Sequence, residues 1–378
     1  MARIRLGMVG GGNDAFIGGV HRIAARIDDR FELVAGALSS TPEKSAASAE
    51  ALGIERSYGS FAEMAEAEAA RDDGIEAVAI VTPNHVHFAA AQAFLAKGIH
   101  VICDKPLTST MDDAHAMEQA VAQSDALFVL THNYTGYPMI REAQAMVASG
   151  QLGDIRIVQA EYPQDWLTSP MENEGLKQAE WRTDPARSGA GGSVGDIGTH
   201  AHNLACFVTG LSVQSLAADL QSWGAGRTLD DNAHVMLRFN GGARGMLWSS
   251  QVAPGNENAL KLRVYGEKGG LEWAQEDPNY LWFTPHGEPK RVITRNGAGA
   301  SDASTSVSRI PGGHPEGYLE GFATIYNEAA DAIRAVQGGA AREAAMGNLP
   351  GIDAGMAGMR FINACVTCSA GNAAWTDL

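Results

Sequence analysis

Short apolar segments alternate with segments of helical spacing over the first third of the chain. The apolar segments are residues 4–9, 31–38, 75–81, 100–103 and 127–130. The helical segments between them are residues 18–28, 42–52, 61–70, 88–97 and 112–123. Short strands that are apolar throughout are typical of a parallel sheet covered on both faces, and right-handed crossovers make such a sheet doubly wound. The alternation therefore predicts a doubly wound α/β domain over residues 1–133.

The pattern changes after about residue 150, where the apolar segments become longer and closer to alternating. These segments are residues 155–162, 213–220, 233–239, 243–251 and 260–266. Gly241-Gly242 reads as a hairpin turn, and residues 266–271 as another turn. The pattern predicts an antiparallel sheet with one open face, in a second domain over residues 134–378. Its two closing helices, residues 318–336 and 353–370, can pack back on the first domain.

Charge and cysteine content limit the class of partner. Lys and Arg number 28 and Asp and Glu number 44, so the formal net charge is −16. This balance argues against nucleic acid as the main partner, because phosphate backbones need a basic footprint. There is neither a long apolar run nor a start typical of a signal peptide, so we expect no membrane association and a cytoplasmic location. Cys365-x-x-Cys368 has no second pair to complete a zinc site, so we expect buried packing residues and no metal.

A glycine-rich loop follows the first predicted strand. Gly10 and Gly12 fit the first two positions of G-x-G-x-x-G, where glycine permits a tight turn and close approach of the backbone to a pyrophosphate. Ala15 stands at the third position, so we assign that role to Gly18, after an insertion of three residues. With Asn13, these residues predict a dinucleotide site in which backbone N–H groups hold the phosphates. The alternative is a plain glycine-rich turn.

Polar residues also follow the second predicted strand. NAD enzymes often place an acidic residue there for the ribose 2′-hydroxyl, whereas NADP enzymes often offer an arginine. This chain has Ser39, Ser40 and Lys44, which can bond either cofactor or simply form a turn and a solvated helix start. We expect NAD and leave NADP open.

Two further polar segments lie at the strand ends, where open α/β sheets bind ligands. The first is Thr82-Pro83-Asn84 with His87, which are cofactor candidates unless they only cap and pack the following helix. The second is Asp104-Lys105-Pro106. A residue before proline is held extended, so the Lys105 amine can project into the crevice, although an isolated lysine is often merely solvated.

A carboxylate and an imidazole follow a second glycine-rich run. Asp196 and His200 are spaced i, i+4, which on a helix places both side chains on one face. A carboxylate beside an imidazole fixes its tautomer and raises its basicity, which suits removal of a proton from an alcohol during hydride transfer. The alternative is a capping Asp and a packed His.

Gly10-x-Gly12, Asp104-Lys105-Pro106 and Asp196-x-x-x-His200 together resemble the Gfo/Idh/MocA oxidoreductase family over nearly the whole chain. The resemblance implies an N-terminal Rossmann domain, a C-terminal α/β domain with a large, mostly antiparallel sheet, and a homodimer or homotetramer formed through that sheet. It carries the catalytic roles over to Lys105, Asp196 and His200. The chain departs from the family in its glycine loop and in Asp104, where glutamate is usual.

The resemblance further implies NAD(P)-dependent oxidation of a ring hydroxyl of a sugar, sugar derivative or cyclitol. His200, oriented by Asp196, would accept the hydroxyl proton, and Lys105, near the nicotinamide, would stabilise the alkoxide. The alternatives are a glycosidase that oxidises its substrate transiently with bound NAD and a non-catalytic cofactor-binding regulator.

Substrate contacts are expected mainly from an irregular segment at residues 164–195. Residues 296–311 read as a second, flexible stretch. The substrate candidates, each of which is at least as readily a packing or surface residue, are Asn133, Tyr134, Trp166, Lys177, Trp181, Arg182 and His314, beside Asp196 and His200.

Overall fold

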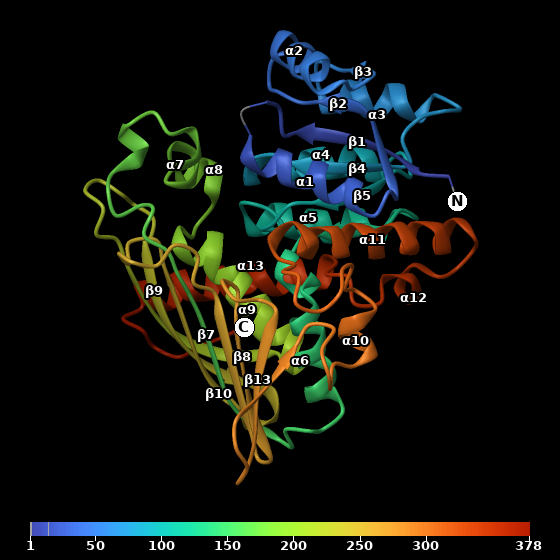
Figure 1. Cartoon of the computed structure of the whole chain (residues 1–378). Coiled ribbons are helices and arrows are strands. Elements are labelled where there is room, and N and C mark those ends of the chain that lie inside the picture. Colours follow the sequence, from blue (N-terminus) through green and yellow to red (C-terminus); the bar gives the residue numbers. More distant parts are fainter. Residues whose placement is uncertain (1, 14) are drawn as a thin grey trace. The chain divides into compact units, whose positions relative to one another are not determined.

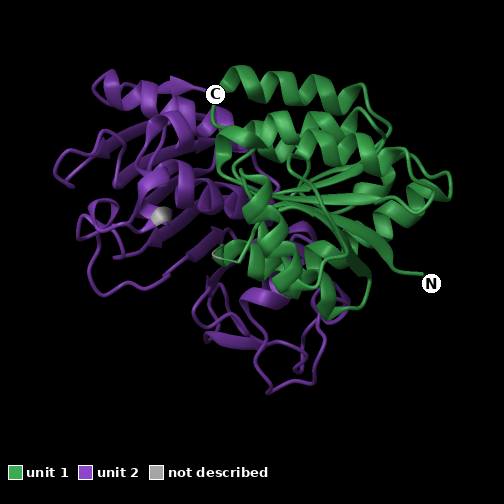
Figure 2. Ribbon diagram, turned by 90° about the horizontal axis from the view of Figure 1, so that it is seen from above, with its two compact units in different colours: residues 1–133, 322–357 green, residues 134–321, 358–378 purple. Residues whose placement is uncertain are grey.

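The structure is a computed structural model that describes residues 2–13 and 15–378, apart from the side chain of residue 177. The chain divides into two compact units (Figure 2). The first unit comprises Met1–Asn133 and Phe322–Ala357, and the second comprises Tyr134–Gly321 and Gly358–Leu378. Residues 322–357, which hold most of one closing helix, thus belong with the first unit.

A six-stranded sheet runs through the first unit. Its strands are β1 (Ile4–Gly10), β2 (Phe31–Ala37), β3 (Arg56–Ser57), β4 (Ala77–Val81), β5 (His100–Cys103) and β6 (Phe128–Leu130). Their order is β3-β2-β1-β4-β5-β6, and every pair of neighbours is parallel. Figure 2 shows these strands between two layers of helices. The predicted doubly wound sheet is confirmed, with the two-residue β3 as a strand too short for the pattern to reveal.

Helices connect these strands and complete the unit. They are α1 (Phe16–Ile27), α2 (Pro42–Leu52), α3 (Phe61–Ala69), η1 (Asn84–Val86), α4 (His87–Leu95), α5 (Met111–Ala122), α11 (Tyr318–Gln337) and α12 (Arg342–Met346). Local chemistry sets several of their ends. The hydroxyls of Ser60 and Thr110 each accept a backbone N–H in the first turn of α3 and α5, and Gly53 ends α2 in the left-handed region.

A nine-stranded sheet dominates the second unit. Its strands are β7 (Ile155–Pro163), β8 (Val213–Gln221), β9 (Asn232–Phe239), β10 (Arg244–Ser250), β11 (Lys261–Gly266), β12 (Gly269–Ala274), β13 (Tyr280–Pro285), β14 (Arg291–Thr294) and β15 (Thr376–Asp377). Their order is β14-β13-β12-β11-β7-β10-β9-β8-β15. All neighbours are antiparallel except β7 and β10. The mostly antiparallel sheet is therefore confirmed, as is the hairpin turn at Gly241-Gly242 between β9 and β10.

One face of this sheet is covered and the other is open. The helices α6 (Pro138–Ala148) and α9 (Thr199–Thr209) lie against β7, β11, β12 and β13 (Figure 1). On the opposite face, Met236 of β9 pairs with Met246 of β10, and these side chains are 53% and 57% exposed. Ile157 and Trp282 add exposed apolar side chains to the same face.

The remaining helices of the second unit are short, apart from the last. They are η2 (Asn133–Gly136), η3 (Met171–Asn173), α7 (Lys177–Arg182), α8 (Pro185–Ser188), the π-helix η4 (Val194–Gly198), η5 (Asn240–Gly242), α10 (Asp302–Thr305) and α13 (Ile352–Ala370). Cys365 and Cys368 are buried in α13, as predicted, and the Ala218 N–H donates to Cys368 Sγ at 3.1 Å. Within the described residues, no helix is long and apolar enough to cross a membrane.

Two predicted loops are more ordered than their composition suggests. Residues 296–311 contain α10, because the Glu142 carboxylate accepts the N–H and hydroxyl of Ser301 and the hydroxyl of Ser304. The predicted turn at 266–271 is shorter, since β12 already begins at Gly269. A Cβ at Gly270 would lie 2.6 Å from the Tyr265 ring on β11, so glycine permits a close pairing of strands here.

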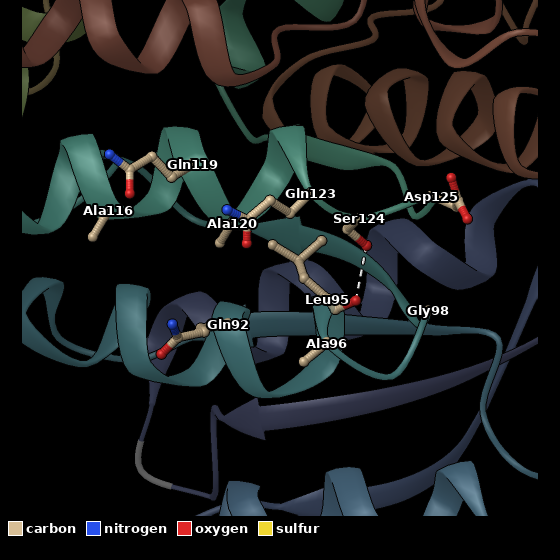
Figure 3. Close-up of a pocket in the computed structure, with 10 residues that line it drawn as sticks. All are labelled: Gln92, Leu95, Ala96, Gly98, Ala116, Gln119, Ala120, Gln123, Ser124 and Asp125. Carbon is tan, nitrogen blue, oxygen red and sulfur yellow. Dashed lines mark hydrogen bonds between the residues drawn. The ribbon is translucent and has the colours of Figure 1, made fainter.

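A pocket of about 440 Å³ lies on the first unit between α4 and α5 (Figure 3). Its polar lining residues are Gln92, Gln119, Gln123, Ser124 and Asp125. At its far end the Ser124 hydroxyl donates to the Leu95 carbonyl at 2.8 Å. Leu95 ends α4 and Ser124 follows α5, and the two residues precede β5 and β6, so the pocket lies away from the carboxyl ends of the strands, where the cofactor candidates stand.

Candidate active site

The glycine loop after β1 is built from close backbone contacts. Gly10 and Gly11 have φ angles of 77° and 72°, which favour glycine. A Cβ on Gly18 would lie 2.4 Å from Gly11 Cα, so α1 approaches the loop closely at this position. This contact supports the choice of Gly18 over Ala15 as the third glycine of the motif. Arg22 of α1, a residue that the sequence analysis did not select, donates to the Gly11 carbonyl and so helps to hold the loop.

Gly12 stands at the edge of the loop beside the carboxyl end of β2. A Cβ there would lie 2.8 Å from Ser48 Oγ and 3.0 Å from the Leu38 carbonyl oxygen, so the backbone has no room for a side chain on this side. Ser39 is half-buried, whereas Asn13, Ser40 and Lys44 are exposed. The three polar candidates after β2 therefore stay accessible to a ligand. Among the described residues, no carboxylate forms a hydrogen bond with Ser39 or Ser40.

Three cofactor candidates follow β4, and their surroundings differ. Thr82 Oγ1 is buried and has no hydrogen-bond partner among the described residues, so it is a polar atom that a ligand can satisfy. Asn84 beside it is also buried. His87 differs from its predicted role. Its ring nitrogens lie 2.9 Å from the Pro106 carbonyl and 3.0 Å from the Thr82 carbonyl, and the side chain is fully buried. His87 therefore holds two loops together, as the packing alternative expects, instead of presenting a donor to a cofactor.

Asp104 lies in a polar network beneath its loop. Its Oδ1 accepts the Thr131 hydroxyl at 2.9 Å and the Lys105 N–H at 3.0 Å. His21 Nε2 lies 3.9 Å away, and His21 Nδ1 is 2.8 Å from the Tyr326 hydroxyl. Burial alone would raise the pKa of Asp104, but His21 and Lys105 hold it well below its usual range. The carboxylate therefore stays charged and fixes the backbone at Lys105.

In the second unit the catalytic candidates lie on consecutive helices. Asp196 belongs to η4, and His200 lies in the first turn of α9. Arg182 Nε lies 3.2 Å from Asp196 Oδ2, and Gln251 Nε2 donates to the same oxygen at 2.9 Å. The carboxylate is thus oriented by a cation from α7 and an amide that follows β10. His200 itself is buried, with 7% of its surface exposed.

The turn before Asp196 is clamped by Asp230. Its carboxylate accepts the N–H of Gly192 at 2.6 Å and that of Val194 at 2.8 Å, and its carbonyl accepts the Ser193 N–H at 2.7 Å. Burial raises the pKa of Asp230 to about 6 although both N–H donors act in the opposite direction. The Gly192 carbonyl in turn accepts the Asp196 N–H at 2.8 Å. Asp230 therefore sets the course of the backbone that carries Asp196.

Two tyrosine rings lie beside His200. The Tyr134 ring meets the imidazole edge-on with centroids 4.9 Å apart, and its hydroxyl bonds that of Tyr162. Tyr162 donates to Asn258 Oδ1 at 2.7 Å. Burial raises the pKa of both phenols, so they remain protonated near neutral pH.

Of the other substrate candidates, one belongs to this cluster and the rest lie elsewhere. Trp166 joins it through Gln164, which accepts the indole N–H and donates to Asn258. The Trp181 ring lies under Arg182, with the guanidinium carbon 4.3 Å from its centroid. His314 stands on an exposed loop whose carbonyls bind Arg295. Asn133 is buried in the first unit, and the Lys177 side chain lies outside the described residues.

Comparison with known proteins identifies the family. A model of an oxidoreductase family with an NAD-binding Rossmann fold matches residues 4–132, and a model of the GFO/IDH/MocA C-terminal domain matches residues 140–272. The chain belongs to the Gfo/Idh/MocA oxidoreductase family. The crystal structure of an oxidoreductase from Sinorhizobium meliloti shares 62% identity and a TM-score of 0.89, with 100% of each chain covered.

Two other proteins that are similar to this chain carry more specific names. An inositol dehydrogenase homolog from Azotobacter vinelandii, solved with NAD⁺, is 36% identical with a TM-score of 0.95 and covers 100% of this chain and 97% of its own. Levoglucosan dehydrogenase from Pseudarthrobacter phenanthrenivorans is 29% identical over 305 residues, which is 73% of this chain and 75% of that protein. The first unit is accordingly an NAD-binding Rossmann domain, and its glycine loop and the unsatisfied Thr82 hydroxyl fit that cofactor.

Three of the residues that build the site were missed because their roles depend on distant contacts. Arg22, Asp230 and Gln251 act on the backbone or carboxylate of residues from 11 to 55 positions away. A signal existed for one of them: the Asp230-Asp231 pair directly precedes an apolar strand, where charge is costly unless it is bonded.

Proposed function

We propose that the chain is an NAD-dependent dehydrogenase that oxidises a ring hydroxyl of a sugar, sugar derivative or cyclitol. The carrying observation is the Asp196–His200 arrangement, in which two donors fix the carboxylate and the Tyr134 ring packs edge-on against the imidazole. A buried imidazole that follows an oriented carboxylate suits a general base for an alcohol. The names of its relatives support a polyol substrate, since they include a levoglucosan dehydrogenase and an inositol dehydrogenase homolog.

The Rossmann unit supplies the cofactor-binding residues. The backbone at Gly10, Gly11 and Gly12 and the start of α1 would receive the pyrophosphate, because N–H groups at a helix start favour anions. Thr82 and Asn84 would bond the nucleotide at the end of β4. When bound, NAD supplies the acceptor for the hydride that leaves the carbinol carbon. Ser39 and Ser40 would bond the ribose hydroxyls of NAD. If NADP bound instead, Lys44 is the candidate cation for its 2′-phosphate.

The acid–base work falls to three side chains. His200 accepts the substrate hydroxyl proton at an imidazole nitrogen, while Asp196 stabilises the resulting imidazolium. The Lys105 ammonium stabilises the negative charge that develops on the substrate oxygen. Asp104 keeps the backbone of Lys105 in place.

A substrate screen tests this function. The protein is incubated with myo-inositol, levoglucosan and free pyranoses, each with NAD⁺ or NADP⁺, and the absorbance of the reduced cofactor is followed. We expect stoichiometric reduction of NAD⁺ by at least one polyol. Cleavage of an aryl glycoside without accumulation of NADH would instead indicate a redox-neutral glycosidase and contradict the proposal.

We also propose that copies of the chain associate through the open face of the nine-stranded sheet. Met236, Met246, Ile157 and Trp282 expose apolar surface there, and such surface is typical of an interface. Sedimentation velocity should show a dimer or tetramer for the wild type and a monomer for the Met236→Glu, Met246→Glu double variant. A wild-type monomer at micromolar concentration would contradict this.

A further inference from the structure

Arg182 places a positive charge directly against the carboxylate that precedes His200. Arg182 Nε is 3.2 Å from Asp196 Oδ2, the oxygen that also accepts the Gln251 amide. The two charged side chains are only 23% and 15% exposed, so water screens this ion pair less than a surface pair. The Arg182 cation therefore offsets part of the negative charge that Asp196 presents to its other neighbours.

The guanidinium is held by its own helix as well. It stacks on the neighbouring Trp181 ring, and its Nη1 donates to the side-chain oxygen of Gln178. All three residues belong to α7. A planar cation fixed at several points loses little further freedom when it binds a carboxylate. Arg182 is thus already paired within the protein, and its predicted contact with a substrate stays a prediction.

We propose that Arg182 is a positioning residue for the Asp196–His200 pair: it orients the carboxylate and offsets part of its charge, which limits the basicity of His200. This proposal rests on the proposed function in one respect, namely that His200 is the general base. An anion near an imidazole favours its protonated form, and a cation on the same anion opposes that effect. Arg182 thereby keeps His200 neutral, and so able to accept a proton, at lower pH than Asp196 alone would allow.

Three groups described beside this pair, Gln251, Tyr134 and Tyr162, carry no charge near neutral pH, whereas Asp230, which bonds the turn before Asp196, has a pKa of about 6. Gln251 follows β10, Tyr134 belongs to η2 and Tyr162 to β7. Burial raises the pKa of both tyrosines, and the charge of Asp196 contributes to that rise. Removal of Arg182 therefore changes the electrostatic field at His200 without a change in the charge of these neighbours.

Titration of the His200 imidazole by NMR tests the proposal without any substrate. Protein labelled with carbon-13 at histidine Cε1 is compared as wild type, Arg182→Gln, Arg182→Met and Arg182→Lys, and His200→Gln identifies the signal. We expect the His200 midpoint to rise by about one pH unit in the two uncharged variants, as loss of a nearby cation favours imidazolium. It should stay near the wild-type value in Arg182→Lys, which keeps the charge. Arg71→Gln, which breaks an exposed ion pair with Asp73 in the first unit, should leave it unchanged.

Two outcomes would overturn the proposal. One is an unchanged midpoint in whichever uncharged variant keeps the wild-type circular dichroism spectrum. The other is an equal rise in Arg182→Lys, which would assign the effect to geometry instead of charge. Failure of the proposed dehydrogenase would be visible separately, as the absence of NAD⁺ reduction with every polyol in the screen.

Discussion

The carbonyl oxygen of Asp230 lies 2.0 Å from the point at which a Cβ atom would stand on Gly192. No side chain fits there, so the turn that precedes Asp196 depends on glycine at this position and on the carboxylate that bonds the adjacent N–H groups. Gly192 of this glycine-rich run is therefore a packing requirement of the second unit and does not by itself indicate contact with a ligand.

Gly192→Ala should destabilise the protein by about 2 kcal/mol, because an added methyl group must displace the backbone at Asp230. Gly195→Ala is the matched control, since a Cβ at Gly195 meets nothing within 4 Å. Urea denaturation followed by tryptophan fluorescence measures both. Equal stability of the two variants would show that the turn yields easily.

Asp230→Asn should alter how stability depends on pH. The pKa of Asp230 is raised from 3.8 to about 6, so the folded chain binds more protons than the unfolded chain between these values. The stability that Asp230 contributes is complete below pH 3.8 and is lost as the pH rises through 6. Asparagine does not ionise, so from pH 4 to 7 the variant should gain about 2 kcal/mol relative to wild type. A relative stability that is flat over this range would be inconsistent with the assignment.

Gly18→Ala should weaken NAD binding at least about tenfold, which corresponds to about 1.4 kcal/mol. Its Cβ would collide with Gly11 and move the loop that receives the pyrophosphate. Gly19→Ala is the control, because its Cβ would meet only the end of the Arg22 side chain at 3.9 Å. Fluorescence titration with NADH gives both affinities. Similar affinities for the two variants would argue against the place assigned to Gly18.

Lys105→Ala and His200→Ala should each lower turnover by about 100-fold or more, the range expected for loss of an acid–base group. NADH titration should still show binding, because the glycine loop is intact in both. The measurement uses whichever polyol the substrate screen identifies. Near-normal turnover in either variant would remove that residue from the mechanism.

Local signals explain where the prediction of the fold succeeded. The bounds of α2 agree with the predicted helix at residues 42–52 because Pro42 begins it and Gly53 ends it. The bounds of β5 agree because its four residues are all buried. β12 was missed because Gly269-Gly270 is typical of a turn, and its suitability for a strand depends on contacts with Tyr265 and Thr284 that only the folded chain reveals.

The candidate site shows the same division. Gly18 could be selected because it directly precedes a helical pattern, and Asp196 and His200 because they stand four residues apart, while their roles stay predictions. The actual partners of Arg182 and His87 could not, because a charge or an imidazole reads the same in the sequence whether it bonds the protein or a ligand. Only burial and neighbouring acceptors distinguish the two cases.

The division of the chain has a consequence for its synthesis. The chain passes between the two units three times, after residues 133, 321 and 357. The imidazole of His21 is bonded by Tyr326, which is 305 positions further on. A ribosome that has already released all six strands of the first unit has therefore not yet made the helix that covers α1. The nascent Rossmann unit must wait for most of the second unit to emerge before it can finish folding, and chaperones would meet it in that incomplete state.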